Sequence, residues 1–306
     1  MFNIIRDLFR PKKPDLIPAS TAVQTAPIDE EMLRQAPKIV TPEPVKIRPP
    51  QLLVGVAQST GRQRDHNEDT LYAMHAILAD GDNDLPFGIF LVADGMGGHL
   101  NGEVASRSAA RAFPEYVLKT FYLAYLSGAA NSGEMASIHE IMEKGVNEAQ
   151  RAVLRSAPGG GTTLTAVLVV GDQVTLAHVG DSRAYFLHAN GRIEVITQDH
   201  SLVRRLQDLG QIDEKEASIH PQRNVLYRAL GQSEPFRPDL KTMEMPISGT
   251  ILLCSDGLWG SVPDEDIYNI VQNAPNLTIA AHNLIEAANL AGGPDNISAI
   301  LVQYQN

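Results

Sequence analysis

The sequence has few of the features that would place it outside the cell or in a membrane. Its 306 residues include one cysteine, Cys254, which excludes an internal disulfide and favours a reducing compartment such as the cytoplasm. No apolar run reaches the roughly 18 residues that a membrane-spanning helix needs. Residues 1–10 carry charges inside a short apolar stretch, unlike a secretory signal. Histidine and cysteine are nowhere spaced as in a zinc site.

Positive charge is also scarce, and the deficit is uneven along the chain. The net charge is −11; residues 1–50 hold eight basic and six acidic residues, which leaves 17 basic against 30 acidic residues in the remainder. Such an acidic chain is a poor candidate for neutralising phosphates, so we expect no nucleic-acid partner. The acidity suits cation binding, but it is also a common means of keeping a protein soluble.

The first part of the chain differs in composition from the rest. Residues 11–50 contain nine prolines and no sustained apolar periodicity, and proline disfavours both helix and sheet. We therefore expect residues 1–50 to be a disordered, proline-rich tail or linker, and residues 51–306 to form the folded domain. Residues 1–13 combine apolar and basic side chains, which allows either a helix that contacts a membrane or partner, or a frayed terminus.

After residue 50, apolar runs alternate with turn signals. Strands are expected at 52–58, from about residue 69, and at 87–93, 162–170, 173–179, 184–188, 251–254 and 297–304. Helices are expected at 102–126 (kinked or restarted at Pro114), 134–156, in pieces over 199–230, and near 264–272 and 277–290. Paired strands with inserted helix pairs, rather than strict strand–helix alternation, predict an α+β layered domain.

Acidic residues stand at the ends of several of these strands. Three apolar strands lead into Asp94-Gly95, Asp256-Gly257 and Asp295-Asn296, and a further strand begins after Glu68-Asp69. A single Asp-Gly is usually a plain turn. Four acidic elements at strand ends are harder to explain as turns alone, and oxygen ligands of this kind suit Mg²⁺ or Mn²⁺.

Six short motifs occur in the order of one enzyme family. They are residues 64–69 (RDHNED), 92–99 (VADGMGGH), 159–163 (GGGTT), 179–185 (VGDSRAY), 253–259 (LCSDGLW) and 293–298 (GPDNIS). The set resembles the metal-dependent protein phosphatases, the PPM or type 2C group, in their bacterial form. The resemblance covers about residues 52–304 and implies an antiparallel β-sandwich flanked by antiparallel helix pairs, in α-β-β-α layers. Residues 51–306 would then be the catalytic domain.

The resemblance also implies a set of metal ligands. Those similar to the ligands of a two-metal centre are Asp69, Asp94, Gly95 (through its carbonyl), Asp256 and Asp295. Asp94 would bridge the two ions, Glu68 would act through bound water, and Asp181 with Asp256 matches a third, weaker metal position. The implied cofactors are two Mn²⁺ or Mg²⁺ ions, with a third at the weaker position. Two such cations can activate a water near neutral pH.

Arg64 matches the family arginine that holds the substrate phosphate, and its planar fork suits that task. The alternative is a surface arginine paired with a local carboxylate. Eukaryotic members often have a histidine general acid after Asp-Gly, but that position is Met96, which cannot donate a proton. His99 is either an acid or a structural residue, and metal-bound water is another candidate donor. Packing or turn-fixing roles are expected of Trp259, Ser182 and Arg183.

Other histidines and arginines have ordinary alternatives. His178 lies in an apolar strand and is expected to be a core histidine with its hydrogen bonds satisfied. Residues 199–231 align with the variable flap beside the active site of bacterial members. Within it, His200, Arg204 and Arg205 either meet a phosphopeptide or form a solvated helix face.

The function implied is that of a protein-serine/threonine phosphatase, which hydrolyses phosphoserine and phosphothreonine with a metal-activated water at a two-metal centre. The partners expected are phosphorylated proteins, the substrates of a serine/threonine kinase, acted on by a cytoplasmic monomer. Two alternatives stay open. A pseudophosphatase would bind phosphoproteins without turnover, although the retained metal positions argue against it. A third possibility is a phosphatase dedicated to one phosphoprotein in a partner-switching pathway.

Overall fold

The computed structural model describes residues 49–79, 84–97, 100–128, 136–232, 236–246 and 248–305. These residues belong to one unit, Lys46–Asn306. Apart from Pro49 and Pro50, the expected tail lies outside the described residues, and so does His99.

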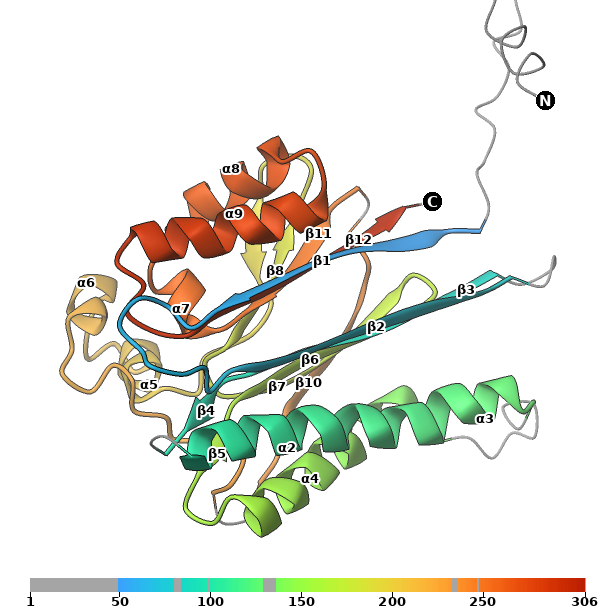
Figure 1. The fold of residues 1–306 in the computed structure, drawn as a ribbon, viewed down its shortest axis with the longest axis horizontal. Coiled ribbons are helices and arrows are strands. Elements are labelled where there is room, and N and C mark those ends of the chain that lie inside the picture. Colours follow the sequence, from blue (N-terminus) through green and yellow to red (C-terminus); the bar gives the residue numbers. More distant parts are fainter. Residues whose placement is uncertain are drawn as a thin grey trace, which may run out of the picture. The chain divides into compact units, whose positions relative to one another are not determined.

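Two five-stranded antiparallel sheets stack face to face (Figure 1). The first has the order β1 (Gln51–Ser59), β12 (Ile297–Gln305), β11 (Thr250–Cys254), β8 (Arg183–Leu187) and β9 (Ile193–Val195). The second has the order β10 (Asp239–Glu244), β7 (Gln173–Val179), β6 (Leu164–Val170), β3 (Asp84–Ala93) and β2 (Thr70–Ala79). A separate short pair joins β4 (Gly95–Met96) to β5 (Gly161–Thr162).

A helix pair covers the outer face of each sheet (Figure 1). The second sheet is covered by α2 (Leu100–Val117) and α4 (Ile138–Ser156), and the first by α8 (Asp264–Asn273) and α9 (Leu277–Leu290). A π-helix, η1 (Leu118–Tyr122), and α3 (Leu123–Leu126) extend α2, while the short helices are α5 (Leu202–Asp208), α6 (Glu214–Ser218) and α7 (Asp256–Trp259). The layers run α-β-β-α, which confirms the predicted fold class.

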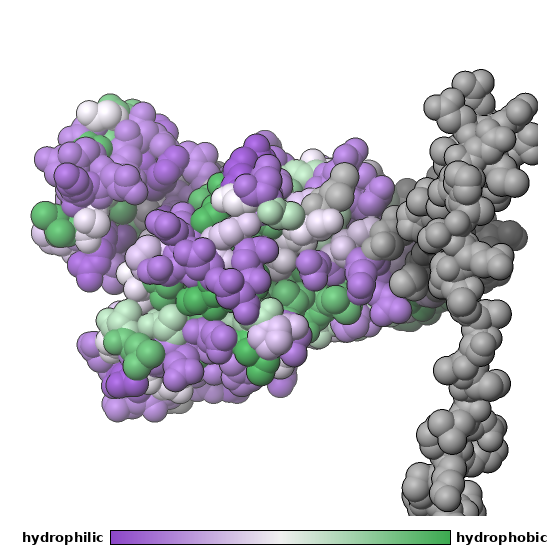
Figure 2. All heavy atoms as spheres, turned by 90° about the horizontal axis from the view of Figure 1, so that it is seen from above, coloured by the Kyte–Doolittle hydropathy of each residue, from purple (hydrophilic) through white to green (hydrophobic). Residues whose placement is uncertain are grey.

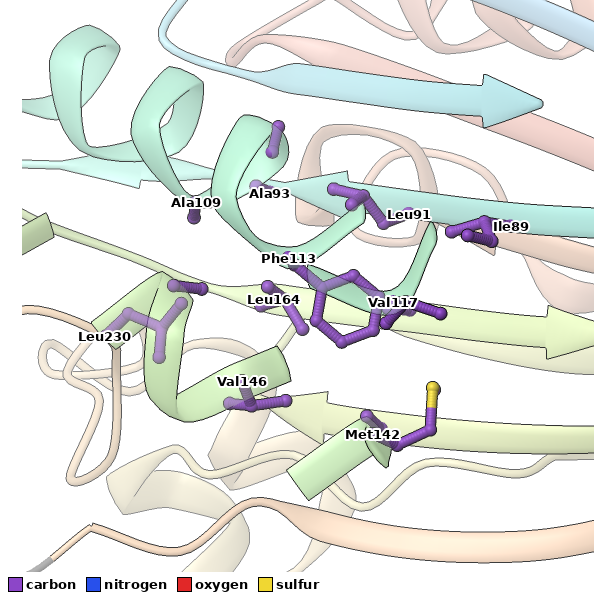
Figure 3. Packing of buried hydrophobic residues seen from close by; sticks show 14 of the residues in the cluster. Ile89, Leu91, Ala93, Ala109, Phe113, Val117, Met142, Val146, Leu164 and Leu230 are labelled. Carbon is purple, nitrogen blue, oxygen red and sulfur yellow. The ribbon is translucent and has the colours of Figure 1, made fainter. Parts of the chain in front are cut away.

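Three layers of buried apolar side chains hold these elements together. Figure 3 shows one of them, in which Phe113 and Val117 of α2 and Val146 of α4 pack against Leu91 and Leu164 of the second sheet. A second cluster lies between the two sheets, and a third lies between the first sheet and α8 and α9. Packing on both faces makes the strand ends a rigid base for the polar residues that follow them.

Most of the expected elements are confirmed, and the differences include Pro114 and β10. Pro114 lies inside α2 and does not restart it; the helix runs on to Val117, and the π-helical turn follows. Proline removes one helical hydrogen bond, and the burial of Phe113 and Val117 against the sheet helps to offset that loss. β10 has no counterpart among the sequence predictions. It is an edge strand that pairs with β7 alone and is mostly exposed, so its sequence has no clear apolar alternation.

Candidate functional site

The candidate site lies at the end of the sandwich where β4 and α7 are found (Figure 1). Asp94 follows β3, Asp256 begins α7 two residues after the end of β11, and Asp69 directly precedes β2. Asp295 stands two residues before β12, which pairs with β11, and Asp181 lies in the turn between β7 and β8. Five acidic residues that are far apart in the sequence therefore meet at one end of the two sheets.

Burial and mutual repulsion raise the pKa values of Asp69, Asp94, Asp181 and Asp256. Burial is the main cause that raises the pKa of Asp69 to about 7, against the hydrogen bonds it accepts from two serines. Burial and the charge of Asp295 raise the pKa of Asp256 to about 6. The pKa of Asp94 is well above its usual range because of burial and then the charges of Asp69, Asp256, Asp181 and Asp295. Carboxylates held together in this way favour a proton or a cation.

Two oxygens at this site are left without a hydrogen-bond partner. Within the described ranges, the buried atoms Asp69 Oδ1 and Asp256 Oδ1 have no donor. A buried carboxylate oxygen without a donor or cation is energetically costly. The other Asp69 oxygen, Oδ2, accepts hydrogen bonds of 2.7 Å from the hydroxyls of both Ser255 and Ser298. Those two bonds leave only Oδ1 available for a ligand.

These residues fit a hard cation, because the donor set consists of oxygen atoms and two of them have no donor. The convergence is looser than in a closed ligand cage. No three His, Cys, Asp or Glu side chains in the described ranges form such a cage. The two oxygens without a donor and the raised pKa values of Asp69, Asp94 and Asp256 support the fit.

Asn296 ties the loop that carries Arg64 and Glu68 to the start of β12. Its Oδ1 accepts a 2.8 Å hydrogen bond from the Glu68 N–H, and its Nδ2 donates to the carbonyls of Thr60 at 2.8 Å and His66 at 3.0 Å. The residue is only 5% exposed, so water does not compete strongly for these bonds. One buried amide thus fixes both ends of the loop beside Asp295.

Glu68 and Gly95 approach each other through the start of α2. A Cβ at Gly95 would lie 2.2 Å from the carbonyl oxygen of Gly102 and 2.6 Å from that of Glu68. A Cβ at Gly102 would lie 2.2 Å from Glu68 Oε2. Glycine at both positions therefore allows the Glu68 side chain and the Gly95 backbone to share this crowded corner.

Asp94 is held by its backbone. Its N–H donates to the Thr163 hydroxyl at 2.9 Å, and its carbonyl accepts from the Thr163 N–H at 2.9 Å. The Thr162 hydroxyl donates to the same carbonyl at 2.9 Å. Thr162 and Thr163, at the end of the motif 159–163, thus fix the aspartate after β3 in place.

Arg64 has the carboxylate partner that the simpler alternative requires. Its Nη2 donates to Asp295 Oδ2 at 2.7 Å, and the Arg64 side chain is 50% exposed. That partner is itself a candidate metal ligand, so the pair also places the guanidinium group beside the site. The bond uses one of the five N–H donors of arginine. Both sequence interpretations of Arg64 therefore stay compatible with the geometry.

His178 has both ring nitrogens bonded, as expected of a core histidine: Nδ1 to the Thr165 hydroxyl at 2.9 Å and Nε2 to the Gln198 carbonyl at 3.1 Å. Both interpretations of His200, contact with a phosphopeptide and a solvated helix face, are wrong. The residue is only 2% exposed, and its Nδ1 accepts a 3.0 Å hydrogen bond from the Gly180 N–H. Arg204 and Arg205 are exposed, and Arg204 pairs with Asp208 at 3.1 Å, as on an ordinary helix face.

The buried histidine predicts a pH effect on stability. Burial, then the charge of His200, lowers the pKa of His178 to about 3, whereas an unfolded histidine titrates near 6.5. Below about pH 6.5 the His178 side chain is protonated in the unfolded chain but stays neutral in the folded chain. The free energy of unfolding therefore decreases as the pH is lowered, by roughly 2 kcal/mol at pH 5.

Urea unfolding at pH 7.5 and pH 5 should therefore show a smaller loss for His178→Asn than for the parent protein. The exposed His75 provides the matched control, His75→Asn. Equal losses in the parent and in His178→Asn would contradict the assignment.

Known proteins share this fold. Residues 61–286 match the family model described as Protein phosphatase 2C. The chain belongs to the protein phosphatase 2C family. Serine/threonine phosphatase stp of Listeria welshimeri is 36% identical to this phosphatase 2C over 249 residues, 79% of this chain and 92% of stp. Serine/threonine protein phosphatase PstP of Mycobacterium tuberculosis is 38% identical over 244 residues, 79% of this chain but 43% of PstP.

A solved structure extends the comparison to the metal. The catalytic domain of PstP in complex with two manganese ions has a TM-score of 0.65 and 32% identity, covering 83% of this phosphatase 2C chain and 99% of that chain. The predicted family and reaction are confirmed: the chain is a metal-dependent serine/threonine protein phosphatase that acts on phosphorylated proteins. The manganese ions of PstP agree with the cofactor prediction. In the described ranges, no helix has the length and apolar character needed to cross a membrane.

Several residues around this phosphatase 2C site carry no clear signal in the sequence. Ser255, Ser298 and Asn296 lie inside recognised motifs, but sequence alone assigns them no contact. Their partners are distant: Ser298 bonds Asp69 across 229 positions, and Asn296 bonds Glu68 across 228. The available signal is a polar residue at the start of an otherwise buried apolar strand.

Proposed function

We propose that this phosphatase hydrolyses phosphoserine and phosphothreonine at a centre formed by Asp69, Asp94, the Gly95 carbonyl, Asp256 and Asp295. The observation that carries the proposal is the pair of buried oxygens, Asp69 Oδ1 and Asp256 Oδ1, which have no donor within the described residues. Asp94 lies within electrostatic reach of four other aspartates and is the proposed bridge between two ions. Glu68 acts through water, and Asp181 joins Asp256 at a third, weaker position.

When bound, the Mn²⁺ or Mg²⁺ ions supply an activated water and neutralise charge on the phosphoryl group. The side chains of the chain itself bind and orient. The two serine hydroxyls occupy Oδ2 of Asp69 and leave Oδ1 for a cation. Asn296 fixes the loop that presents Arg64, whose remaining N–H donors hold the substrate phosphate. Met96, in β4 next to Asp94, has no proton to donate to the leaving alkoxide.

We extend the proposal to partners and location. The substrates are proteins phosphorylated by a serine/threonine kinase, and the enzyme acts as a monomer in the cytoplasm. The single cysteine supports a reducing compartment, and the acidic charge disfavours nucleic acid. On the face seen in Figure 2, most of the surface is hydrophilic and the hydrophobic residues form a narrower band across it. The proposal includes contact of residues 1–13 with a membrane through their apolar and basic side chains.

The proposed domain division predicts the behaviour of a truncated chain. Residues 1–50 act as a tether, and residues 51–306 form the catalytic domain. A protein that lacks residues 1–50 should keep its thermal unfolding temperature and its kcat on para-nitrophenyl phosphate within about twofold, because β1 begins at Gln51. A large loss of either quantity would show that the first 50 residues belong to the catalytic fold.

One assay tests the proposed reaction. Phosphate release is measured from para-nitrophenyl phosphate and from a phosphothreonine peptide, with Mn²⁺, with Mg²⁺ and with a chelator. The proposal expects turnover of both substrates with either ion and none with the chelator. Absence of metal-dependent turnover would favour the pseudophosphatase. Turnover of a single native phosphoprotein alone would favour the dedicated phosphatase.

A further inference from the structure

The turn that carries Asp181 is held from two sides. On one side, the Trp259 indole Nε1 of α7 donates a 3.0 Å hydrogen bond to the Asp181 carbonyl. On the other, the His200 N–H donates to the Gly180 carbonyl at 2.7 Å, and the Gly180 N–H donates to His200 Nδ1 at 3.0 Å. The turn is therefore attached both to the helix that starts with Asp256 and to the beginning of the segment 199–230.

Arg183 joins these two sides. Its guanidinium carbon lies 3.6 Å from the centroid of the Trp259 ring, over the face. Its Nη2 donates to Asp199 Oδ2 at 2.7 Å, and its Nε donates to Asp199 Oδ1 at 3.0 Å. A planar cation stacked on an aromatic face and bonded to a buried carboxylate through two nitrogens has little freedom to move.

The turn also has little room to shift. Gly180 has φ of +106°, and a Cβ there would lie 2.5 Å from Thr163 Cγ2. The Thr163 hydroxyl contacts the Ser182 hydroxyl at 2.7 Å and accepts from the Asp94 N–H at 2.9 Å. A displacement of Arg183, which is stacked on Trp259 and bonded to Asp199, would therefore also displace Asp181 and its neighbours.

Segment 199–230 returns to the same place at its other end. The Tyr227 N–H donates to the His200 carbonyl at 2.9 Å, and Arg228 Nη1 donates to Asp239 Oδ1 at 2.7 Å. His200 Nε2 lies 3.2 Å from Asp239 Oδ2; since Nδ1 accepts from Gly180, the neutral ring carries its proton on Nε2 and donates it to Asp239. Both ends of the segment thus meet at the residues that hold the Asp181 turn.

We propose that Arg183 is a positioning residue. Clamped between Trp259 and Asp199, it sets the place of Asp181 and couples the base of segment 199–230 to the carboxylate site. The inference rests on the proposed function, in which Asp181 and Asp256 form the weakest of the metal positions. Arg183 itself touches neither substrate nor metal.

The test is Arg183→Lys in the full chain. Lysine keeps the positive charge but has neither the planar fork nor the stacking face. Isothermal titration of Mn²⁺ into metal-free protein should show a rise of about ten- to hundredfold in the Kd of the weakest site, the usual cost of losing a residue that orients a ligand. The tighter sites should change less, and amide hydrogen exchange at residues 199–202 should become faster. The matched control is Arg192→Lys, in an exposed ion pair with Glu194 on the β8–β9 hairpin.

A second variant keeps the test decisive if Arg183→Lys does not fold. Trp259→Phe retains an aromatic face but loses the indole donor to Asp181, so it should raise the same Kd by about three- to tenfold. Unchanged binding at the weakest site in whichever of the two variants folds would overturn the inference. Unchanged amide exchange at residues 199–202 in Arg183→Lys would overturn the coupling of segment 199–230 to the site. If Asp256→Asn also kept full Mn²⁺ binding, the proposed metal centre would fail instead of the positioning role.

Discussion

Replacing Asp256 by asparagine is expected to lower kcat at limiting Mn²⁺ by at least about a hundredfold, since even residues that only orient a metal ligand cost ten- to hundredfold. Asp256 Oδ1 is buried and has no donor in the described part of the chain. Asparagine has nearly the same shape, so the start of α7 is retained while the negative charge that a cation needs is lost. The measurement is hydrolysis of a phosphothreonine peptide as a function of Mn²⁺ concentration.

Two features separate this effect from a general loss of charge. Asp266→Asn, an exposed aspartate in the first turn of α8, removes the same charge away from the site and should leave activity unchanged. High Mn²⁺ should partly restore Asp256→Asn if the defect is one of binding. Full activity of Asp256→Asn at limiting Mn²⁺ would show that Asp256 is not a ligand.

Replacing Arg64 by alanine is expected to raise the KM for a phosphothreonine peptide by about ten- to hundredfold, with a smaller change in kcat. Hydrogen bonds to a charged group contribute about 1.5–3 kcal/mol, which corresponds to that range. The half-exposed guanidinium has donors to spare beyond its single bond to Asp295. Steady-state kinetics of the parent and variant at saturating Mn²⁺ provide the comparison.

The Arg64→Lys variant tests whether the substrate phosphate needs the paired N–H donors of a guanidinium group or only a positive charge. Lysine should recover part of the lost affinity, because it keeps the charge but not the paired donors. An unchanged KM in Arg64→Ala would support the simpler interpretation, in which Arg64 is only an ion-pair partner of Asp295. If the Mn²⁺ dependence of Arg64→Ala changed while its KM did not, Arg64 would again be only an ion-pair partner of Asp295. The changed Mn²⁺ dependence would then come from the loss of the ion pair that holds Asp295.

The large apolar strands could be predicted because buried strands appear in the sequence as continuous apolar runs. Residues 87–93 are entirely buried and end abruptly at Asp94, so both the strand and its acidic end are visible in the sequence. β10 could not be predicted in this way, since an edge strand with one partner needs no apolar alternation. Pro114 shows the converse, because tertiary packing of α2 overrides a local helix breaker.

The site was predictable in its charges but not in its supports. Asp69, Asp94 and Asp256 stand beside glycines or strand ends that mark them in the sequence. The hydroxyl of Ser255 meets Asp69 across 186 positions, a contact that no local pattern encodes. The burial of His200 is not predictable for the same reason, since its sequence neighbours are polar although its ring is buried against Gly180.

The most direct test of the metal centre is a crystal structure of the full chain with Mn²⁺, with anomalous scattering recorded at the manganese edge. We predict two strong anomalous peaks among Asp69, Asp94, Asp256 and Asp295, with Asp69 Oδ1 and Asp256 Oδ1 in contact with an ion and Asp69 Oδ2 still bonded to its two serines. Peaks only elsewhere, or ions that leave both of these oxygens without a ligand, would contradict the proposed centre.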